Sequence, residues 1–326
     1  MNTILSLRKC NSQFYNTVMY EWEDDLVQKG FVLEMRSEFA KKMGLLIQKI
    51  IKSPYRIRQT ISMSGSYGGG KKTHNRLVFL MFVSQYREYY PNKVIPIFID
   101  TRVDSFEVLI EGIKDIDLAI ITNRSTWEKA KQIYPEKKLY SIPLWCSGKW
   151  ILDTPPTKTV DVLQIGRKND ILHSFMLRFV STHPKVEYVY REDCSNDYIS
   201  TIRGNIGSLE TREDYMAALR KARVCLVSSP LVDSAPEMDF ITPRVYESAM
   251  SYCYMLGRFT RNAEFKEVGL DRVVDIIEDY ETFESRLTGC IESKDFIRKA
   301  DFDHFISDNS FDARYKELSR ILDFID

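Results

Sequence analysis

A glycine-rich segment that ends in two lysines is the first stretch of the chain whose residue types could do chemistry. Residues 64–73, SGSYGGGKKT, contain the pattern G-x-x-x-x-G-K from Gly65 to Lys71, in which backbone N–H groups and a lysine surround nucleotide phosphates. In a P-loop, Ser or Thr follows that lysine and binds Mg²⁺, whereas Lys72 stands in this place here. The segment therefore has two interpretations. The glycines line the cleft of another kind of two-domain enzyme, or, as the alternative, an ATP-dependent kinase or NTPase uses them as its phosphate loop.

Three short segments in the second half of the chain contain residue types that suit a phosphate-bearing ligand. In QIGRKN, a strand end is followed by Gly166, which lets a ligand approach the backbone, and by two cations suited to a diphosphate, Arg167 and Lys168. In SSP, two hydroxyl residues, Ser228 and Ser229, end a strand. An exposed basic turn and an ordinary Ser-Pro turn are the structural alternatives for these two segments.

The third segment is TPRVYESAM, residues 242–250, which has the pattern of a helix start. Thr242 is a good N-cap, and Pro243 suits the first helical position because its missing N–H costs nothing there. The free N–H groups and the positive dipole end of such a helix favour a phosphate, and Arg244 adds a full charge. Glu247, one turn further on, can accept hydrogen bonds from two adjacent sugar hydroxyls, with a solvated glutamate of an amphipathic helix as the alternative.

Two residues in the first half are candidates for a general base. Asp100 ends a predicted strand, where a carboxylate can face an acceptor hydroxyl, although a helix cap or a turn gives the same pattern. His74 follows the glycine-rich segment and could accept a proton, but a histidine one turn into a helix is more often a surface residue. Asp100 is the stronger candidate by its position.

These segments are positioned by an alternation of strands and helices, which predicts parallel sheets covered on both faces. In the first half, a helix over residues 33–52 precedes a strand that enters the glycines, and a helix over 73–90 leaves them. Further strands are expected at 93–100, 117–123 and 138–145, with helices at 106–115 and 126–135 between them.

The alternation restarts after residues 146–159, a stretch with a glycine, a Pro-Pro pair and no clear period. A strand is expected to run into Gly166, and a loop, a helix and a strand to follow one another over 240–260. The other expected elements are helices at 170–184, 212–222 and 311–325 and strands at 186–192 and 223–230.

We therefore predict an α/β chain of two Rossmann-like, doubly wound domains that face each other across a cleft. The first domain covers residues 1–150, including the helical lead-in, and the second covers 151–308. A C-terminal helix, 309–326, is expected to cross back to the first domain.

The order of the segments in the second half resembles the donor domain of GT-B glycosyltransferases, in particular the broad group-1 and spore-protein-like set. In that family a G-R turn precedes a strand with the pattern Y…L..A.v.l.pS, similar to YMAALRKARVCLVSS here, and a helix with the pattern TpRvfEalacG, similar to TPRVYESAM here. The resemblance covers roughly residues 138–275 and includes YPEKKLYSIPLW, which is similar to the family's YP.kki.vIPng. It departs at 251–254, SYCY, where the family often has small residues and a glycine.

This resemblance implies a metal-independent glycosyltransferase that moves a sugar from a nucleotide diphosphate sugar to an acceptor hydroxyl. It implies that Arg167 and Lys168 hold the donor diphosphate and that Glu247 holds the donor ribose hydroxyls. Thr242 and Arg244 would flank the phosphate or the sugar. No metal or other cofactor is expected, because the arginines and the helix end take the role that a metal has in other transferases.

The resemblance also implies a role for the glycine-rich segment and a chemical class for the acceptor. In GT-B enzymes the first strand of the N-terminal domain ends in a glycine-rich turn at the cleft, which gives this role to Gly68, Gly69 and Gly70. The acceptor is expected to be a glycan or a lipid-linked hydroxyl. A non-catalytic protein that keeps the fold and binds a partner stays as a further alternative.

The composition restricts the kinds of partner and the cellular compartment that we expect for this chain. Lys and Arg together equal Asp and Glu at 46 each, with no long basic stripe, so no nucleic-acid partner is expected. The six cysteines lack metal-ligand spacing, which is typical of reduced thiols in the cytoplasm, and Cys225 and Cys253 are expected in the core. No stretch reaches the roughly 20 apolar residues of a transmembrane helix, so we expect a cytoplasmic protein, with peripheral association at the inner face of the membrane as an option.

Overall fold

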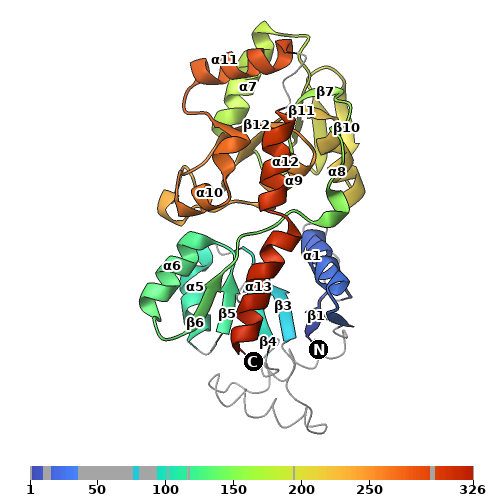
Figure 1. Ribbon diagram of the computed structural model, residues 1–326. Coiled ribbons are helices and arrows are strands. Elements are labelled where there is room, and N and C mark those ends of the chain that lie inside the picture. The colour runs from blue at the N-terminus through green and yellow to red at the C-terminus, as the bar shows by residue number, and fades with distance from the viewer. Residues whose placement is uncertain are drawn as a thin grey trace. The chain divides into compact units, whose positions relative to one another are not determined.

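The computed structural model divides by its internal contacts into two compact units, Met1–Pro143 with Tyr315–Asp326, and Leu144–Arg314. The divisions drawn from the sequence fall after residues 150 and 308. Each unit is a sheet with helices packed against it (Figure 1). The residues that the structure describes are 2–9, 16–35, 76–80, 94–100, 103–114, 116, 118–193, 195–293 and 298–325.

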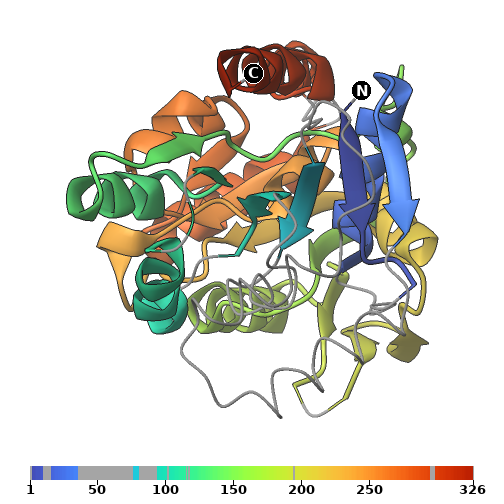
Figure 2. The same cartoon turned by 90° about the horizontal axis from the view of Figure 1, so that it is seen from below.

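The first unit contains a parallel sheet in the order β2-β1-β3-β4-β5-β6. Each neighbouring pair of these strands runs parallel, so the chain must cross over the sheet between strands, and helices cover it. In Figures 1 and 2, α6 lies toward one edge of the sheet and α1 toward the other. The elements are β1 (Thr3–Ser6), α1 (Thr17–Gln28), β2 (Val32–Met35), β3 (Arg76–Leu80), β4 (Val94–Phe98), α5 (Val103–Ile113), β5 (Leu118–Ile121), α6 (Arg124–Ile133) and β6 (Lys138–Ser141).

The core of the first unit follows from the apolar character of its central strands. The strands β3 and β4 are almost entirely buried and are continuous apolar runs, as is typical of parallel sheets that are covered on both faces. Val78, Phe98 and Ile121 form one apolar cluster with Leu109 and Ile113 of α5. The predicted strands at 93–100, 117–123 and 138–145 are thereby confirmed as β4, β5 and β6.

Two helices predicted in the first half are wrong over the residues that the structure describes. Residues 76–80 form β3, which pairs with β1 and β4, in place of part of a helix over 73–90. A short apolar run such as LVFL fits a buried strand and a buried helix equally well by its periodicity, so only strand pairing decides. The helix predicted over 33–52 likewise begins in β2, and the sequence analysis missed β1 and α1. The glycine-rich segment therefore does not follow the first strand of the chain.

The last helix, α13 (Phe311–Ile325), begins in the second unit and returns to the first, as predicted (Figures 1 and 2). The ring of Tyr315 in α13 lies with its centroid 6.4 Å from that of Phe31. The ammonium group of Lys29 lies 5.5 Å from the centroid of the same Tyr315 ring. These contacts attach the end of the chain to the segment between α1 and β2.

The second unit contains a mixed sheet in the order β10-β9-β8-β7-β11-β12-β13. The five strands from β8 to β13 in this order run parallel, whereas β9 runs antiparallel to both β8 and β10. The strands and helices predicted over 160–260 are confirmed. The elements are β7 (Val160–Gln164), α7 (Asp170–Thr182), β8 (Tyr188–Arg191), β9 (Asp197–Ser200), β10 (Gly204–Ser208), α8 (Arg212–Lys221), β11 (Ala222–Ser228), α9 (Pro243–Met250), β12 (Tyr254–Arg258), α10 (Ala263–Glu267), β13 (Val274–Ile276), α11 (Tyr280–Glu292) and α12 (Lys299–Asp308).

Helices cover both faces of this second sheet, which confirms the doubly wound α/β arrangement. On one face, Val224 of β11 belongs to an apolar cluster with Phe179 of α7 and Phe283 of α11. Successive side chains of a strand point to opposite faces, and the next residue, Cys225, lies beside Ser248 of α9. The chain therefore places α7 and α11 on one face and α9 on the other.

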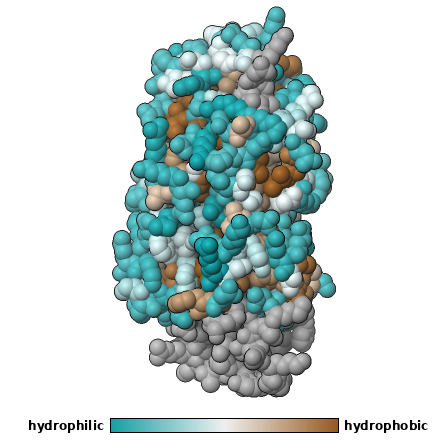
Figure 3. Space-filling view, in the orientation of Figure 1, coloured by the Kyte–Doolittle hydropathy of each residue, from teal (hydrophilic) through white to brown (hydrophobic). Residues whose placement is uncertain are grey.

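The interior and the surface of the molecule differ as expected for a globular protein. Cys225 and Cys253 are free thiols with no exposed surface, which confirms their predicted place in the core. On the face drawn in Figure 3, hydrophilic residues dominate and apolar side chains occupy small separate areas. No helix in the described part of the chain is long and apolar enough to cross a membrane.

Candidate functional site

The strand order of the second unit creates a place where ligands of such folds bind. The chain goes from β7 to β8 on one side of β7 and later adds β11 on the other side, so the order reverses between β7 and β11. In open α/β sheets, ligands bind outside the carboxyl ends of the strands at this switch point. The turn at 165–169 follows β7, and the loop at 229–242 follows β11 and leads into α9. The residues that the sequence analysis assigned to the donor lie in these segments, at the end of β11 or in α9.

Gly166, in the turn after β7, lies against the Arg244 side chain of α9. Its φ of +72° lies in the left-handed region that favours glycine. Its N–H group donates a hydrogen bond of 3.2 Å to the hydroxyl of Tyr198 on β9. A Cβ atom at this position would lie 2.6 Å from Nη2 of Arg244, which is shorter than a van der Waals contact. Only glycine therefore allows the turn and the Arg244 guanidinium to occupy their present places.

The Arg244 side chain contacts the Arg167 backbone at the switch point, and neither arginine has a neutralising carboxylate among the described residues. Arg244 is half-buried, and its Nη1 donates a hydrogen bond of 3.0 Å to the backbone oxygen of Arg167. Its Nε is buried and has no hydrogen-bond partner among the described residues. The Arg167 side chain is exposed, and neither arginine forms an ion pair with any carboxylate that the structure describes. A half-buried guanidinium with an unused donor and no described carboxylate partner is suited to bind an anion.

The helix start predicted at Thr242 is confirmed, but the threonine hydroxyl does not cap it. Thr242 is the N-cap residue and Pro243 the first helical residue of α9. The Thr242 side chain makes no capping hydrogen bond, and its Oγ1 is buried without a partner among the described residues. The first N–H groups of a helix lack partners within the helix and carry a partial positive charge. An uncapped N-terminus beside Arg244 adds to the positive potential at the switch point.

Glu247 is not the solvated residue of the alternative interpretation, because it is only 4% exposed. Its Oε1 forms an ion pair of 2.7 Å with Nη1 of Arg212, and its Oε2 accepts a hydrogen bond of 2.7 Å from the hydroxyl of Tyr215. The sequence analysis named Glu247 and missed both partners on α8. The signal that could have found them is their spacing, since residues three apart on a helix share a face.

Lys168, unlike Arg167 and Arg244, has an acidic partner. Its Nζ lies 2.8 Å from Oδ2 of Asp193, and the side chain is only 6% exposed. The same ammonium lies 5.1 Å from the ring centroid of Tyr190, within the range of a cation–π contact. The structure therefore places the Arg244 side chain on the Arg167 backbone, and it pairs Lys168 with Asp193.

The two serines at the end of β11 have different environments. Ser228 is partly exposed, whereas Ser229 is buried and its hydroxyl donates a hydrogen bond to the carboxylate of Asp239. Asp239 also accepts hydrogen bonds from the N–H groups of Leu231, at 3.1 Å, and Thr260, at 3.2 Å. Burial raises the pKa of Asp239, while these hydrogen bonds oppose the rise. Ser229 thus helps to fix the loop that leads from β11 to α9.

The departure from the family pattern at SYCY does not change the backbone type there. Tyr252 follows the C-cap residue of α9 and has a φ of +52°, the left-handed conformation that glycine commonly adopts after a helix. Its hydroxyl donates a hydrogen bond of 2.6 Å to Oδ1 of Asp303, and its ring packs on Phe302. These contacts hold a non-glycine residue in a conformation that costs roughly 1–2 kcal/mol.

Of the site residues predicted in the first half, only Asp100 lies among the described residues. It follows β4 by two positions, at the carboxyl edge of the first sheet, and is partly buried. His74 and the three glycines, Gly68, Gly69 and Gly70, lie outside the described residues, as does the whole P-loop-like segment. Their predicted roles stay predictions.

A buried carboxylate that the sequence analysis missed lies at the end of β1. Glu23 of α1 accepts a hydrogen bond of 2.6 Å from the hydroxyl of Ser6 and one of 2.9 Å from Nε of Arg8. Burial raises the pKa of Glu23 to about 7, although Ser6 and Arg8 favour the ionised form. Glu23 is therefore the residue of this unit whose charge is most sensitive to pH near neutrality among those with a resolved shift.

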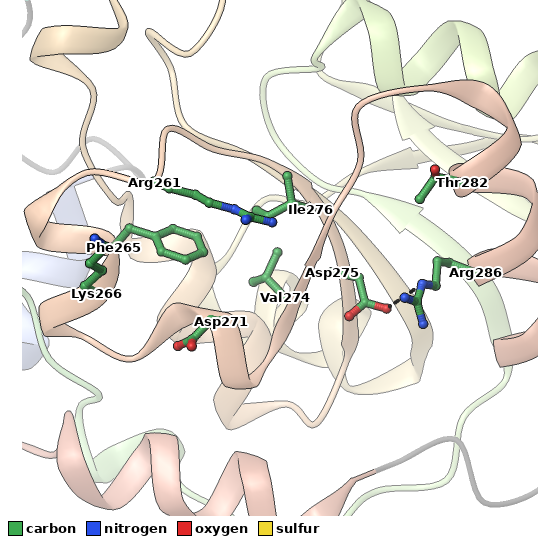
Figure 4. Close-up of a pocket in the computed structure, with 9 residues that line it drawn as sticks. All are labelled: Arg261, Phe265, Lys266, Asp271, Val274, Asp275, Ile276, Thr282 and Arg286. Carbon is green, nitrogen blue, oxygen red and sulfur yellow. Dashed lines mark ion pairs between the residues drawn. The ribbon is translucent and has the colours of Figure 1, made fainter.

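A cavity of about 440 Å³ lies elsewhere in the second unit, between α10, β13 and α11. Figure 4 shows Arg261 and Phe265 on one side of it and Arg286 directed toward Asp275, at 3.5 Å, on the other. It lies at the outer strand of the sheet, and no residue assigned to donor binding lines it. The switch point, which has unpaired cations, is the better candidate for a functional site. Within the described ranges, no three His, Cys, Asp or Glu side chains gather as metal ligands would.

Solved structures of a glucosyltransferase and of a putative epimerase are similar to this chain. The T4 phage β-glucosyltransferase matches with a TM-score of 0.55 over 99% of this chain and 100% of that chain, at 13% sequence identity. The same phage enzyme in complex with UDP-glucose gives 0.55 at 11% identity, over the same shares of the two chains. A putative UDP-N-acetylglucosamine 2-epimerase from Listeria monocytogenes gives 0.56 over 100% of this chain and 96% of that chain, at 9% identity. No protein-family model matches this sequence, and no curated protein matches it.

At these low identities the likeness shows the fold. The chain has the two-domain GT-B fold, as the sequence predicted. One of the similar proteins is a putative epimerase, so the fold alone does not decide the reaction. The reaction must be argued from the residues at the switch point.

Proposed function

We propose that this GT-B chain transfers a sugar from a nucleotide diphosphate sugar to an acceptor hydroxyl without a metal. The observation that carries the proposal is the Arg244 guanidinium at the uncapped start of α9, which bonds to the Arg167 backbone at the switch point of the second sheet. Neither arginine forms an ion pair with a described carboxylate. A diphosphate is the ligand whose charge and size suit two arginines and a helix N-terminus.

In the proposed reaction the acceptor oxygen bonds to the anomeric carbon of the donor sugar. The bond from that carbon to the diphosphate oxygen breaks, and the nucleoside diphosphate leaves with the electron pair. Arg244, Arg167 and the α9 N-terminus stabilise the negative charge that grows on the leaving group, which is the role of a metal in other transferases. Removal of one such preorganised donor typically lowers kcat by roughly 10²- to 10³-fold.

The remaining predicted residues take roles around this diphosphate. Glu247 accepts hydrogen bonds from the donor ribose, and the unpaired hydroxyl of Thr242 bonds to the phosphate or the sugar. Asp100 takes the proton of the acceptor hydroxyl, with His74 as the second candidate. The acceptor is a glycan or a lipid-linked hydroxyl, in keeping with the balanced charge of the chain. Action in the cytoplasm, at or near the inner face of the membrane, is part of the same proposal.

The thermal midpoint of the purified protein with UDP, GDP, CDP, ADP and Mg-ATP in turn, with and without EDTA, tests the donor site. A ligand that binds only the folded state raises the midpoint, so we expect a shift by one nucleoside diphosphate that persists in EDTA. Arg244→Ala should remove the shift. Arg272→Ala is the matched control. Arg272, which precedes β13, forms an ion pair with Asp308 and lies outside the turn after β7 and α9.

Turnover then tests the reaction itself. Release of the nucleoside diphosphate from a matching nucleotide sugar should depend on an added acceptor, with glycans, lipid-linked sugars and DNA compared in one panel. A shift by Mg-ATP alone that is lost in Lys71→Ala would instead assign the nucleotide site to the glycine-rich segment. Binding without turnover in any panel would contradict the transferase proposal and favour a binding protein.

A further inference from the structure

Glu247, Arg212 and Tyr215 form a closed polar cluster between α8 and α9. The side chains of Arg212 and Glu247 are only 9% and 6% exposed, so their 2.7 Å ion pair is shielded from water. The Tyr215 hydroxyl donates to the second carboxylate oxygen, and the Arg212 guanidinium lies 5.1 Å from the Tyr215 ring centroid. These are the partners of the Glu247 carboxylate in the described part of the chain.

The sequence fixes the position of both partners at the start of α8. Thr211 and Asp214 form a reciprocal capping box, in which each side chain accepts a hydrogen bond from the backbone N–H of the other. The cap sets the first helical residue at Arg212. Tyr215 comes three residues later, and residues at this spacing lie on the same face of a helix. That face meets Glu247, which lies one turn into α9.

The cluster leaves part of the Glu247 carboxylate available. An ionised carboxylate has about four acceptor positions, and the described partners use one on each oxygen. A buried ion pair is unfavourable unless its geometry is good and further hydrogen bonds satisfy it. Burial, together with the charge of Glu247, raises the pKa of Tyr215 well above its usual range, so the phenol keeps its proton and donates it. The carboxylate is therefore held in one orientation with one acceptor position left on each oxygen.

We infer that Arg212 and Tyr215 are positioning residues that orient Glu247 to accept both hydroxyls of a ribose, so that the site selects ribonucleotides over 2′-deoxyribonucleotides. The inference rests on the proposed function, because it takes the nucleoside diphosphate of the donor as the ligand. A site built to hydrogen-bond a hydroxyl rejects the analogue that lacks it, because a buried acceptor then stays unpaired. A carboxylate free to rotate would lose part of this selectivity.

The ratio of the dissociation constants of 2′-deoxy-UDP and UDP, measured by calorimetry, tests the inference. GDP and 2′-deoxy-GDP, and ADP and 2′-deoxy-ADP, serve as the further pairs. We expect the wild-type protein to bind one ribonucleotide roughly 10- to 150-fold more tightly than its deoxy analogue, the range for a hydrogen bond to a charged group. In Tyr215→Phe and Arg212→Met this ratio should fall several-fold toward one, and Arg212→Lys should restore part of it.

Two controls separate positioning from loss of structure. Tyr254→Phe is matched to Tyr215→Phe, because the Tyr254 hydroxyl also donates to a carboxylate, that of Asp275 on the edge strand β13. It should leave the ratio unchanged. Thermal midpoints without ligand show whether Arg212→Met is folded, and Tyr215→Phe, which removes a single oxygen, keeps the test decisive if it is not.

Each outcome bears on the inference in a defined way. A wild-type ratio well above one that survives in both Tyr215→Phe and Arg212→Met would overturn it, since the cluster would then be only structural. A wild-type ratio near one with clear nucleotide binding would also overturn it, while the proposed function would stand. Failure of all three pairs, and of CDP with 2′-deoxy-CDP, to bind would overturn the inference together with the proposed function.

Discussion

Replacement of Gly166 by alanine is the most direct perturbation of the candidate site at the switch point, because it acts on the backbone and on Arg244 at once. The new Cβ atom would lie 2.6 Å from Nη2 and 3.3 Å from Cζ of Arg244. The guanidinium is the end of a flexible side chain, so it can move aside. It would then leave the place where it bonds to the Arg167 backbone oxygen.

The effects on stability and on binding can be separated in magnitude. A non-glycine residue in the left-handed region costs roughly 1–2 kcal/mol. For a unit of this size, 1 kcal/mol lowers the thermal midpoint by roughly 2–4 °C, which gives a total of roughly 2–8 °C. Displacement of Arg244 should in addition weaken nucleoside diphosphate binding by roughly 10- to 150-fold, because a hydrogen bond to a charged group is lost.

Gly204 offers the matched control. Its φ is +75°, close to the +72° of Gly166, but no atom lies within 4 Å of the position of its Cβ. Gly204→Ala should therefore lower the thermal midpoint by a similar amount and leave the dissociation constant unchanged. The reasoning is refuted if Gly166→Ala binds the nucleotide as tightly as the wild type, or if Gly204→Ala loses as much affinity.

Three further predictions concern stability. The pKa of Glu23 is raised from 4.5 to about 7, so the folded state binds the proton more tightly and stability is lost as the pH rises from 4.5 through 7. In urea titrations, the free energy of unfolding of the wild type minus that of Glu23→Gln should therefore fall by at most about 3 kcal/mol between pH 4.5 and 8. A difference that stays constant over this range would contradict the prediction. Asp239→Asn should destabilise the second unit by roughly 1–3 kcal/mol in the same assay, because the buried donors around Asp239 lose a charged acceptor. An unchanged urea midpoint would show that water replaces the carboxylate as the acceptor for these donors. Tyr252→Phe should cost roughly 1 kcal/mol through the lost bond to Asp303, whereas Tyr252→Gly should cost more despite its relaxed backbone, and a Gly variant as stable as the wild type would show that the ring packing contributes little.

The sequence predicted the second unit well because its local signals agree with one another. The run from 160 to 164 is apolar and ends before Gly166, and Thr242 with Pro243 marks a helix start, so each boundary has its own local cause. The hairpin of β9 and β10 had no such signal. Its strand 204–208, GNIGS, is largely exposed and consists of residues with low strand propensity apart from one isoleucine.

The first unit was predicted less well in part because its central strand β3 is buried on both faces. A buried parallel strand such as 76–80 has no alternation, so its periodicity does not distinguish it from a buried helix. Pairing with β1 and β4 decides its type, and β1 lies about 70 residues away in the sequence. Such long-range pairing cannot be derived from local propensity.

The amino-acid sequence by itself determined the chemistry available at the candidate site: cations after β7, a helix start at Thr242, and a carboxylate one turn later. Only the tertiary structure decided which of these charges are neutralised. Strand order brings Lys168 to Asp193 and α8 to Glu247, and it leaves Arg244 beside Gly166 without a described carboxylate partner. The physical reason is that a charge is neutralised by whatever lies within a few ångströms, and residues far apart in the sequence are brought that close only by the folded sheet.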